Sequence, residues 1–369
     1  MSDNLRRYRA IEKGLCQLYP GEPQGRMRQS LQVMAMFING IVGSQSTHSR
    51  QVAKKTPTGA KVSSREKQLV RWYQNEAVSY ESHMLPYVQA LLSHLSNLTL
   101  VLMIDGSDIG RNCVTLLVSV VYQSRAIPLI SLVRSGKKGH FPAEMHIELL
   151  RQLWQIVPVD ADVILLGDGE FDSVELQGFL HQAGWHYVCR TAANTRVQLD
   201  GQWLRLDEID LWPGDCRPFY DVAFTQQAYG PVLVIAWWRR DCAEPVYLVT
   251  NLELMEEACC FYRKRMKIET LFSDQKSRGF QLHKSHIADP ARLARVMMAA
   301  CLAYIWIIYL GVLCRHDGWI SHIHRTDRCD LSLFQLGLDL LEFFLNEHLP
   351  IFFELRLPAP TLVYSHDPF

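Results

Sequence analysis

The chain has 369 residues, of which 48% are hydrophobic and 21% are charged, an ordinary composition for a soluble protein. The length predicts two or three domains with a core of useful size. A formal net charge of zero at pH 7, taken alone, argues against a nucleic-acid-binding protein.

The zero net charge hides an asymmetry along the chain. Residues 1–98 carry 13 Lys and Arg against 6 Asp and Glu, whereas the remaining residues carry 25 against 32. This division fits a first domain that meets a polyanion and a second domain that holds cations, although chance variation is an alternative explanation.

The ten cysteines are scattered without a C-x-x-C pair, which favours buried thiols in a reducing compartment. Residues 1–15 contain no apolar stretch of the kind found in secretory signals. We therefore expect a cytoplasmic protein.

The first part of the chain, residues 1–97, is expected to be a helical domain. Apolar residues recur at spacings of three and four in 26–44 and 63–95. Between them lies a polar, basic and turn-rich stretch, and Ser63 or Ser64 followed by Glu66 marks a helix start.

From residue 98 the pattern changes to strands. The apolar runs 98–109, 112–123 and 125–135 are separated by short turns and predict an antiparallel meander. A helix at 142–157, a buried strand at 161–172, a helix at 173–184 and a strand at 185–191 follow. Such alternation predicts parallel βαβ units and hence an α/β fold.

Short strands return in residues 195–252, where Asp200 and Gly201 form a hairpin signal. A charged segment, 261–280, then predicts one helix, and the chain ends in further helices at 286–369. Residues 296–314 contain no charge and approach the roughly 20 residues of a membrane span. We interpret this stretch as the buried helix of a large domain, with a single membrane span as the minority alternative.

Two aspartates close predicted strands. Asp105 ends the first strand and Asp168 ends the fourth. Because carboxyl ends of neighbouring parallel strands meet at one crevice, adjacent placement of these strands brings both carboxylates together. Paired carboxylates repel unless a proton or cation intervenes, and Mg²⁺ prefers such oxygen ligands. Either aspartate alone fits an ordinary turn or helix-capping role at least as well.

The predicted helix at 261–280 presents four polar side chains on one stripe. Tyr262, Arg265, Glu269 and Lys276 fall within about 60° of one another at the helical rotation per residue. Glu269 can complete a metal site, while the cations hold phosphates. The alternative is a solvated helix with Arg265 and Glu269 as an i,i+4 pair.

The spacing Y-x2-R-x3-E-x6-K of these four residues resembles the signature of DDE transposases of the insertion-sequence-four family. The stretches "MIDGSD" and "LLGDGEFD" resemble that family's two aspartate motifs, and "YLVTNLE" is also similar. The resemblance covers residues 99 to roughly 285. It implies an RNase H-like catalytic domain at 98–285 with a β-rich insertion at 195–252, preceded by a helical DNA-binding domain and followed by C-terminal helices that complete the core and contribute to oligomerisation.

The resemblance implies that Asp105, Asp168 and Glu269 are a catalytic triad holding two Mg²⁺ or Mn²⁺ ions. Beside it, Arg265 and Lys276 are expected to neutralise the DNA phosphates and Tyr262 to hydrogen-bond to them. The implied activity is cut-and-paste movement of the insertion sequence through hairpin ends. The implied partners are terminal inverted repeats, target DNA and a second copy of the chain, with no membrane. A bacterial, nucleoid-associated location in the cytoplasm follows. The alternatives are an RNase H-like nuclease without strand transfer and a transposase-derived DNA-binding protein.

The chain departs from the family pattern beside the signature. Met266 stands where many relatives carry tryptophan, and Gly169 where some carry arginine. Trp237 and Trp238 are candidates to stack a flipped base, and they fit a strand core equally well.

Weaker DNA-binding candidates are Lys137 and Lys138, beside His140, which also fit a solvated turn. The basic segment 50–71 fits terminal-repeat binding or a solvated linker. An irregular set of thiols and imidazoles favours zinc only weakly: Cys314, His316, His322, His324 and Cys329.

Overall fold

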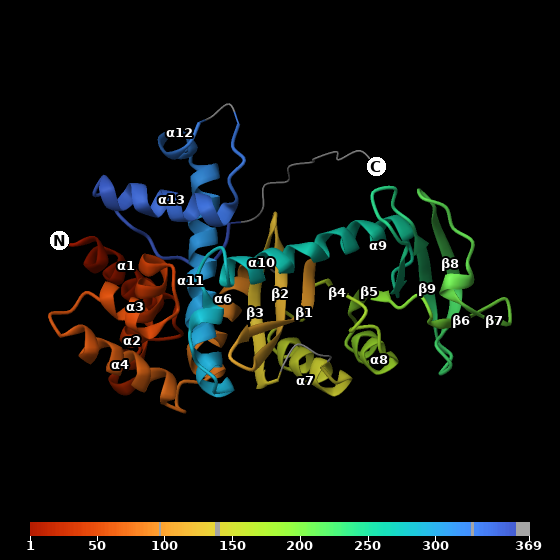
Figure 1. The fold of residues 1–369 in the computed structure, drawn as a ribbon, viewed down its shortest axis with the longest axis horizontal. Helices are drawn as coiled ribbons and strands as arrows, with labels where there is room; N and C mark the ends of the chain where they lie inside the picture. The colour runs from red at the N-terminus through yellow and green to blue at the C-terminus, as the bar shows by residue number, and fades with distance from the viewer. Residues whose placement is uncertain (96, 137–140, 326–327, 359–369) are drawn as a thin grey trace.

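The computed structural model of the chain describes residues 1–95, 97–136, 141–325 and 328–358 (Figure 1). Its first part is helical, as expected from the periodicity: α1 (Asp3–Leu18), α2 (Gly25–Ser44), α3 (Ser49–Lys55), α4 (Val62–Gln74), α5 (Tyr80–His83) and α6 (Leu85–Leu95).

The stretch 63–95, whose periodicity predicted helix, forms three helices, α4, α5 and α6, and the turn-rich stretch before it contains α3. Helix α4 begins at Val62 after Lys61, so neither Ser63 nor Ser64 caps it.

The strands of the described residues form one mixed sheet in the order β3-β2-β1-β4-β5-β10-β9-β8-β6-β7. Strands β1, β2 and β3 make the predicted antiparallel meander, while β1, β4 and β5 run parallel. This mixed arrangement is the expected RNase H-like α/β fold. The first five strands are β1 (Leu100–Gly110), β2 (Cys113–Tyr122), β3 (Arg125–Ser135), β4 (Val163–Gly167) and β5 (His186–Thr191).

The remaining strands extend the same sheet beyond β5, because β10 pairs with β5 and β9 pairs with β10. Asp200 and Gly201 have positive φ angles of 50° and 80° between β6 and β7, which confirms the hairpin. These strands are β6 (Arg196–Leu199), β7 (Gln202–Arg205), β8 (Cys216–Phe224), β9 (Tyr229–Trp237) and β10 (Val246–Thr250), with the short 3₁₀ turn η1 (Leu206–Glu208) after β7.

Helices connect and cover the first five strands. Helix α7 (Ala143–Trp154) packs on β3 and on α8 (Val174–Gln182), which in turn packs on β5. After β10 the chain forms α9 (Met255–Tyr262), the 3₁₀ segment η2 (Arg263–Met266) and α10 (Lys267–Gln275). Helix α10 crosses β1 and β3, and so brings this segment over the end of the meander (Figure 1).

The uncharged stretch near the C-terminus lies in α11 (Pro290–His316), where 89% of its most apolar window is buried. The interpretation as a buried helix is confirmed. Within the described residues, α11 alone is long and apolar enough to cross a membrane by those criteria. It packs closely on α13 (Leu333–Asn346), and glycines at the contact allow this approach. A Cβ atom at Gly311 or Gly337 would collide with the backbone of the other helix. The short elements η3 (Leu282–Lys284) and α12 (Ile320–Ile323) flank α11.

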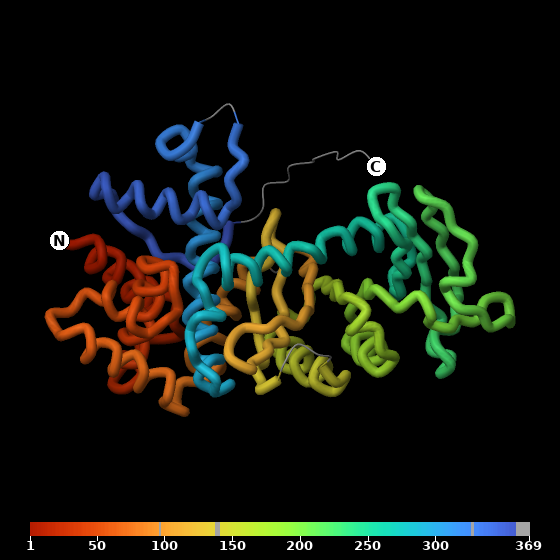
Figure 2. The backbone as a smooth tube through the Cα atoms, viewed as in Figure 1, coloured from red at the N-terminus to blue at the C-terminus, as the bar shows by residue number. Residues whose placement is uncertain are grey.

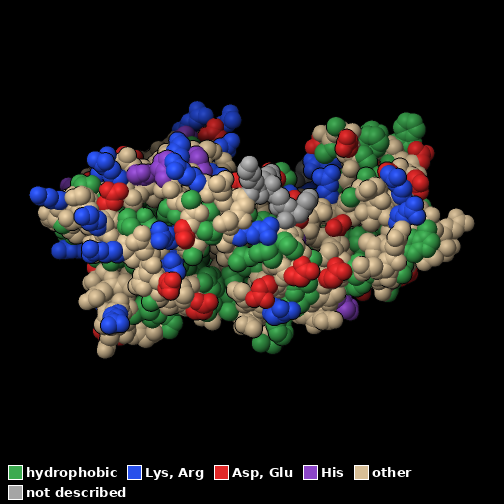
Figure 3. Space-filling view, turned by 60° about the horizontal axis from the view of Figure 1, so that its bottom comes forward, with side chains coloured by type: hydrophobic (Ala, Val, Ile, Leu, Met, Phe, Trp, Pro, Cys, Tyr) green, Lys and Arg blue, Asp and Glu red, His purple; other side chains and the backbone are tan. Residues whose placement is uncertain are grey.

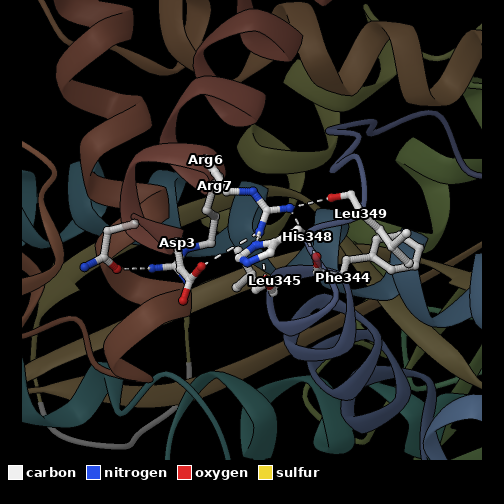
Figure 4. A network of polar contacts seen from close by, with 8 residues as sticks. Asp3, Arg6, Arg7, Phe344, Leu345, His348 and Leu349 are labelled. Carbon is white, nitrogen blue, oxygen red and sulfur yellow. Dashed lines mark hydrogen bonds and ion pairs between the residues drawn. The ribbon is translucent and has the colours of Figure 1, made fainter. Parts of the chain in front are cut away.

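Arg6 of α1 links the first helix to the end of α13 (Figure 4). Its guanidinium donates hydrogen bonds to the carbonyls of Leu345, Phe344 and Leu349, at 2.8, 3.2 and 2.6 Å. A cation at the C-terminus of α13 also complements the helix dipole. The N-terminal helices and α11 to α13 thus gather at one end of the molecule and β6 to β9 at the other, with β1 to β5 and helices α7, α8 and α10 between them (Figure 2).

Candidate active site

Asp105 and Asp168 meet as expected. Asp105 lies within β1, which continues to Gly110, so the prediction that Asp105 ends the strand was wrong. Its Oδ1 accepts a hydrogen bond from the Gly106 amide at 2.7 Å. Asp168 follows the last residue of β4, and its Oδ1 accepts from the Glu170 amide at 3.0 Å. Strands β1 and β4 are parallel neighbours, so the prediction that they lie side by side is confirmed.

The third carboxylate comes from a broken helix rather than the single helix expected for 261–280. Arg265 lies in the 3₁₀ segment η2, Glu269 lies in the first turn of α10, and Lys276 caps its C-terminus outside helical geometry. A single straight stripe was therefore the wrong geometry. The break nevertheless leaves Arg265, Glu269 and Lys276 lining the same cavity.

Arg265 contacts all three carboxylates. Its Nη1 lies 3.8 Å from Asp105 Oδ2 and 3.6 Å from Glu269 Oε1, and its Nη2 lies 3.3 Å from Asp168 Oδ2. The guanidinium is only 11% exposed. One buried positive charge therefore faces three acids, which leaves the cluster with an excess of negative charge when all three are ionised.

The pKa of Asp105 reflects its burial and its neighbours. Burial, with the smaller contributions of the neighbouring Asp168 and Glu269, raises this pKa to about 6, against the attraction of Arg265 and the hydrogen bond from the Gly106 amide. A cation bound between these carboxylates would lower the pKa of Asp105, because a nearby positive charge favours the ionised form of a carboxyl group.

The carboxylates line an open cavity of about 640 Å³ with Lys276, whose Nζ donates to Ser107 Oγ at 2.5 Å. The cavity is large enough to admit a phosphodiester segment. Tyr262, the first residue of the signature, is half-buried and does not line this cavity. Burial raises the pKa of the Tyr262 hydroxyl, while the nearby Arg265 lowers it and Asp168 raises it to a smaller extent.

A second cavity, of about 650 Å³, adjoins the first and shares Asp168 and Arg265 with it. Trp238 and Arg190 line this second cavity. Trp238 is held by a hydrogen bond from its Nε1 to the Cys242 carbonyl at 3.2 Å. The structure thus places Trp238 in a cavity that Asp168 and Arg265 also line.

The neighbouring Trp237 has a different environment. It is 8% exposed, and the guanidinium of Arg263 lies 5.2 Å from its ring centroid. Met266, at the position where many relatives of the resembled family carry tryptophan, is 58% exposed. An aromatic platform beside the cavity is therefore supplied by β9 and the loop after it rather than by η2.

Sequence reasoning missed Glu170, which also lines the first cavity. Its Oε1 accepts a hydrogen bond from the Phe141 amide and lies 3.8 Å from His146 Nε2. His146 is buried against the Phe171 ring, with centroids 4.6 Å apart. The spacing of two acids in "GDGEFD" was the available signal, since residues two apart at a strand end can face one cavity.

The donor chemistry of the triad fits a divalent cation, because Mg²⁺ and Mn²⁺ favour carboxylate oxygens with open positions for water and phosphate. Asp105, Asp168 and Glu269 would hold it. At the triad, the Arg265 guanidinium lies among the acids. Within the described ranges, no three His, Cys, Asp or Glu side chains form a group that could hold a metal ion. The same result gives no support to zinc binding by the cysteines and histidines between 314 and 329. Lys137, Lys138 and His140 lie outside the described residues.

Comparisons with known proteins give one family. The family model described as "Transposase DDE domain" matches residues 105–306. Among solved structures, the piggyBac transposase synaptic complex with hairpin DNA has 12% identity and a TM-score of 0.47, covering 100% of this chain and 89% of that chain. Human ENDOV has 16% identity and a TM-score of 0.28, with 49% and 85% covered. No curated protein matches the chain significantly.

Proposed function

The chain belongs to the transposase DDE-domain family, whose model covers more than half of its 369 residues, and we propose that it cuts and joins the ends of its own insertion sequence. The single observation that carries the proposal is the convergence of Asp105, Asp168 and Glu269 from β1, β4 and α10 on one cavity. The Y-x2-R-x3-E-x6-K spacing supports membership in the insertion-sequence-four group.

The three carboxylates would hold two Mg²⁺ or Mn²⁺ ions, and such ions activate an attacking oxygen and stabilise a leaving one. The protein side chains orient the DNA. Arg265 and Lys276 face the cavity and neutralise phosphates on either side of the reacting one. Because the reaction needs no protein nucleophile, one cavity serves both water and a 3′-hydroxyl.

The hairpin route requires room for a displaced base. The second cavity supplies it beside the carboxylates, and Trp238 offers an aromatic face there. Stacking of a base on an aromatic side chain contributes roughly 1–3 kcal/mol. Trp237 is covered by Arg263, so we assign this role to Trp238.

Binding of the terminal repeats is assigned to the helical region. Lys and Arg side chains stand out along the end formed by these helices, at the left of Figure 3. They belong to the region with 13 cationic against 6 acidic residues. A homodimer is proposed because two ends must be cut together, and a cytoplasmic, nucleoid-associated location follows from the DNA partner.

The test uses purified protein, DNA carrying the gene's own flanking repeats, and Mg²⁺ or Mn²⁺. Asp105→Ala is compared with Asp108→Ala, an exposed aspartate three residues further along β1. We expect metal-dependent cuts, hairpins and joined products from the wild type and from the Asp108 variant, and none from the Asp105 variant.

Cuts without joined products would indicate a nuclease of the same fold. DNA binding with no cut from any of the three proteins would indicate a transposase-derived binding protein. Equal cutting by the Asp105 variant would contradict the assignment of the triad.

A further inference from the structure

Two thiols from different parts of the chain meet where the added strands join the catalytic segment. Cys216 begins β8, and Cys259 lies in α9. Their Sγ atoms are 3.8 Å apart, and the Met255 sulfur lies 3.5 Å from Cys216 Sγ. A disulfide has an S–S distance of about 2.05 Å, so bond formation requires the two sulfurs to approach by less than about 2 Å.

The two thiols are not equivalent. Cys259 is buried, whereas Cys216 is partly exposed and reachable from solvent. Hydrogen bonding with the Cys259 thiol lowers the pKa of Cys216 against the opposing effects of burial and Glu256, and the nearby Arg263 adds a smaller lowering. The same interaction and burial raise the pKa of Cys259. An accessible, thiolate-prone cysteine beside a second thiol is the usual arrangement of an oxidisable pair.

The pair sits at a junction that leads directly to the active site. Cys216 is the register partner of Trp237 in the β8–β9 ladder. The guanidinium of Arg263 lies 5.2 Å from the Trp237 ring, so α9 and η2 contact this strand end at two points. Arg265 follows two residues later, and Trp238 lines the cavity that Arg265 shares.

We propose that Cys216 and Cys259 are a peroxide-reactive pair that forms a disulfide between β8 and α9. The Cys216 thiolate attacks a peroxide oxygen, the O–O bond breaks, and hydroxide leaves to give a sulfenic acid. The Cys259 sulfur then attacks the Cys216 sulfur. The S–S bond forms, the S–O bond breaks, and water leaves with the Cys259 proton. The cysteines lose two electrons, and the peroxide gains them.

The bond regulates the site by fixing the junction. A covalent link removes sliding between α9 and the β8–β9 strand end, and Arg265 and Glu269 lie on the segment that continues from α9. Placement of Arg265 on a DNA phosphate needs that segment to adjust, so oxidation slows cleavage. This consequence rests on the proposed function, whereas formation of the bond does not.

The chemical test treats the full chain with a slight excess of hydrogen peroxide, blocks remaining thiols, and maps peptides by mass spectrometry without reduction. We expect a linked pair of peptides containing residues 216 and 259, reversible by dithiothreitol. Cys216→Ser and Cys259→Ser must lack it. Cys260→Ser is the matched control, because Cys260 is the exposed neighbour of Cys259 and must leave the link unchanged.

Oxidation confined to Cys260, or an intermolecular link that Cys260→Ser abolishes, would overturn the proposal. The functional arm compares DNA cleavage before oxidation, after it and after reduction. We expect at least a fivefold loss that dithiothreitol restores, and no loss in Cys216→Ser. A mapped disulfide with unchanged cleavage would overturn the regulatory role alone, and absent cleavage in the reduced wild type would count against the proposed function instead.

Discussion

Two arginines that pair with acids of α10, Arg125 and Arg265, face carboxylates in different ways. Arg125, at the start of β3, forms one buried ion pair with Asp274 at 2.8 Å, with side chains 6% and 7% exposed. Arg265 is almost as buried, but it faces three carboxylates at 3.3 to 3.8 Å beside an open cavity. Asp274 is in direct contact with Arg125 and is also attracted by Arg278. The three acids around Arg265 share one guanidinium at longer distances.

The difference separates a structural ion pair from a site prepared for a ligand. A buried pair is retained only when its geometry is good, since desolvation is costly. An unbalanced cluster lowers the stability of the folded chain, and such clusters are concentrated at functional sites. One guanidinium does not balance three carboxylates, and divalent cations of the kind used in phosphodiester reactions would supply the remaining positive charge.

The largest expected effect is on catalysis. Glu269→Gln keeps the size of the side chain and removes its charge, so we expect at least about a 100-fold loss of DNA cleavage with end binding retained. The assay is single-turnover cleavage of labelled end DNA, with binding measured by gel shift. The control is Glu257→Gln, an exposed acid in α9. A normal cleavage rate for Glu269→Gln would exclude Glu269 as a ligand.

The next effect is on stability. Asp274→Ala leaves Arg125 buried without its counter-charge, and we expect the free energy of unfolding to fall by about 3–5 kcal/mol. Urea denaturation measures this fall, and exposed Asp160→Ala should change it by less than about 0.5 kcal/mol. The double variant Arg125→Met, Asp274→Leu should recover most of the loss. No recovery would mean that the pair does more than balance charge.

Burial of Asp105 beside Arg265 predicts a pH dependence of stability in the same direction as that of Asp274, because burial raises the pKa of both carboxyl groups to about 6. Because the pKa of Asp105 is raised from 3.8 to about 6, the unfolded chain loses this proton first. The contribution of Asp105 to the free energy of unfolding therefore falls by about 2–3 kcal/mol as pH rises from about 4 to about 6. Urea denaturation across this range should show a flatter profile for Asp105→Asn than for the wild type.

Arg265→Gln tests whether the guanidinium controls the pKa of Asp105. It removes the attraction that lowers the pKa of Asp105, so the fall in stability should extend to higher pH. If the Arg265→Gln profile ends at the same pH as the wild type, the guanidinium does not control this carboxyl group.

The smallest expected effect concerns Lys276, at the edge of the cavity. Lys276→Gln should weaken DNA binding severalfold and reduce the slope of log affinity against log salt by about 1, without sequence preference. Stability should change little. An unchanged salt dependence would show that Lys276 does not contact phosphate.

The core of the fold could be predicted because its signals are local. The apolar runs 98–109, 112–123 and 125–135 with short turns give the meander, and alternation with helices gives the parallel strands. The adjacency of β1 and β4 followed from the fold pattern and brought Asp105 beside Asp168. The ten-strand continuity of the sheet was not predictable, because pairing of β5 with β10 joins residues far apart in sequence.

The segment around Glu269 could be predicted in composition but not in shape. Periodicity does not distinguish an α-helix from α9, η2 and α10 in succession, because tertiary contacts set the 3₁₀ turn. Trp237 and Trp238 are adjacent in sequence, and only packing of Arg263 on Trp237 shows which one is covered. Glu170 was missed because its role depends on Phe141 and His146, which come from another part of the chain.

The most direct test of the central claim is a count of bound Mn²⁺ by electron paramagnetic resonance, without DNA and without turnover. If Asp105, Asp168 and Glu269 are the metal ligands, wild type and Asp108→Asn bind two ions per chain. Asp105→Asn and Asp168→Asn should lose at least one of them while remaining folded by circular dichroism. Equal Mn²⁺ binding by all four proteins would contradict the assignment of this cluster as the metal site.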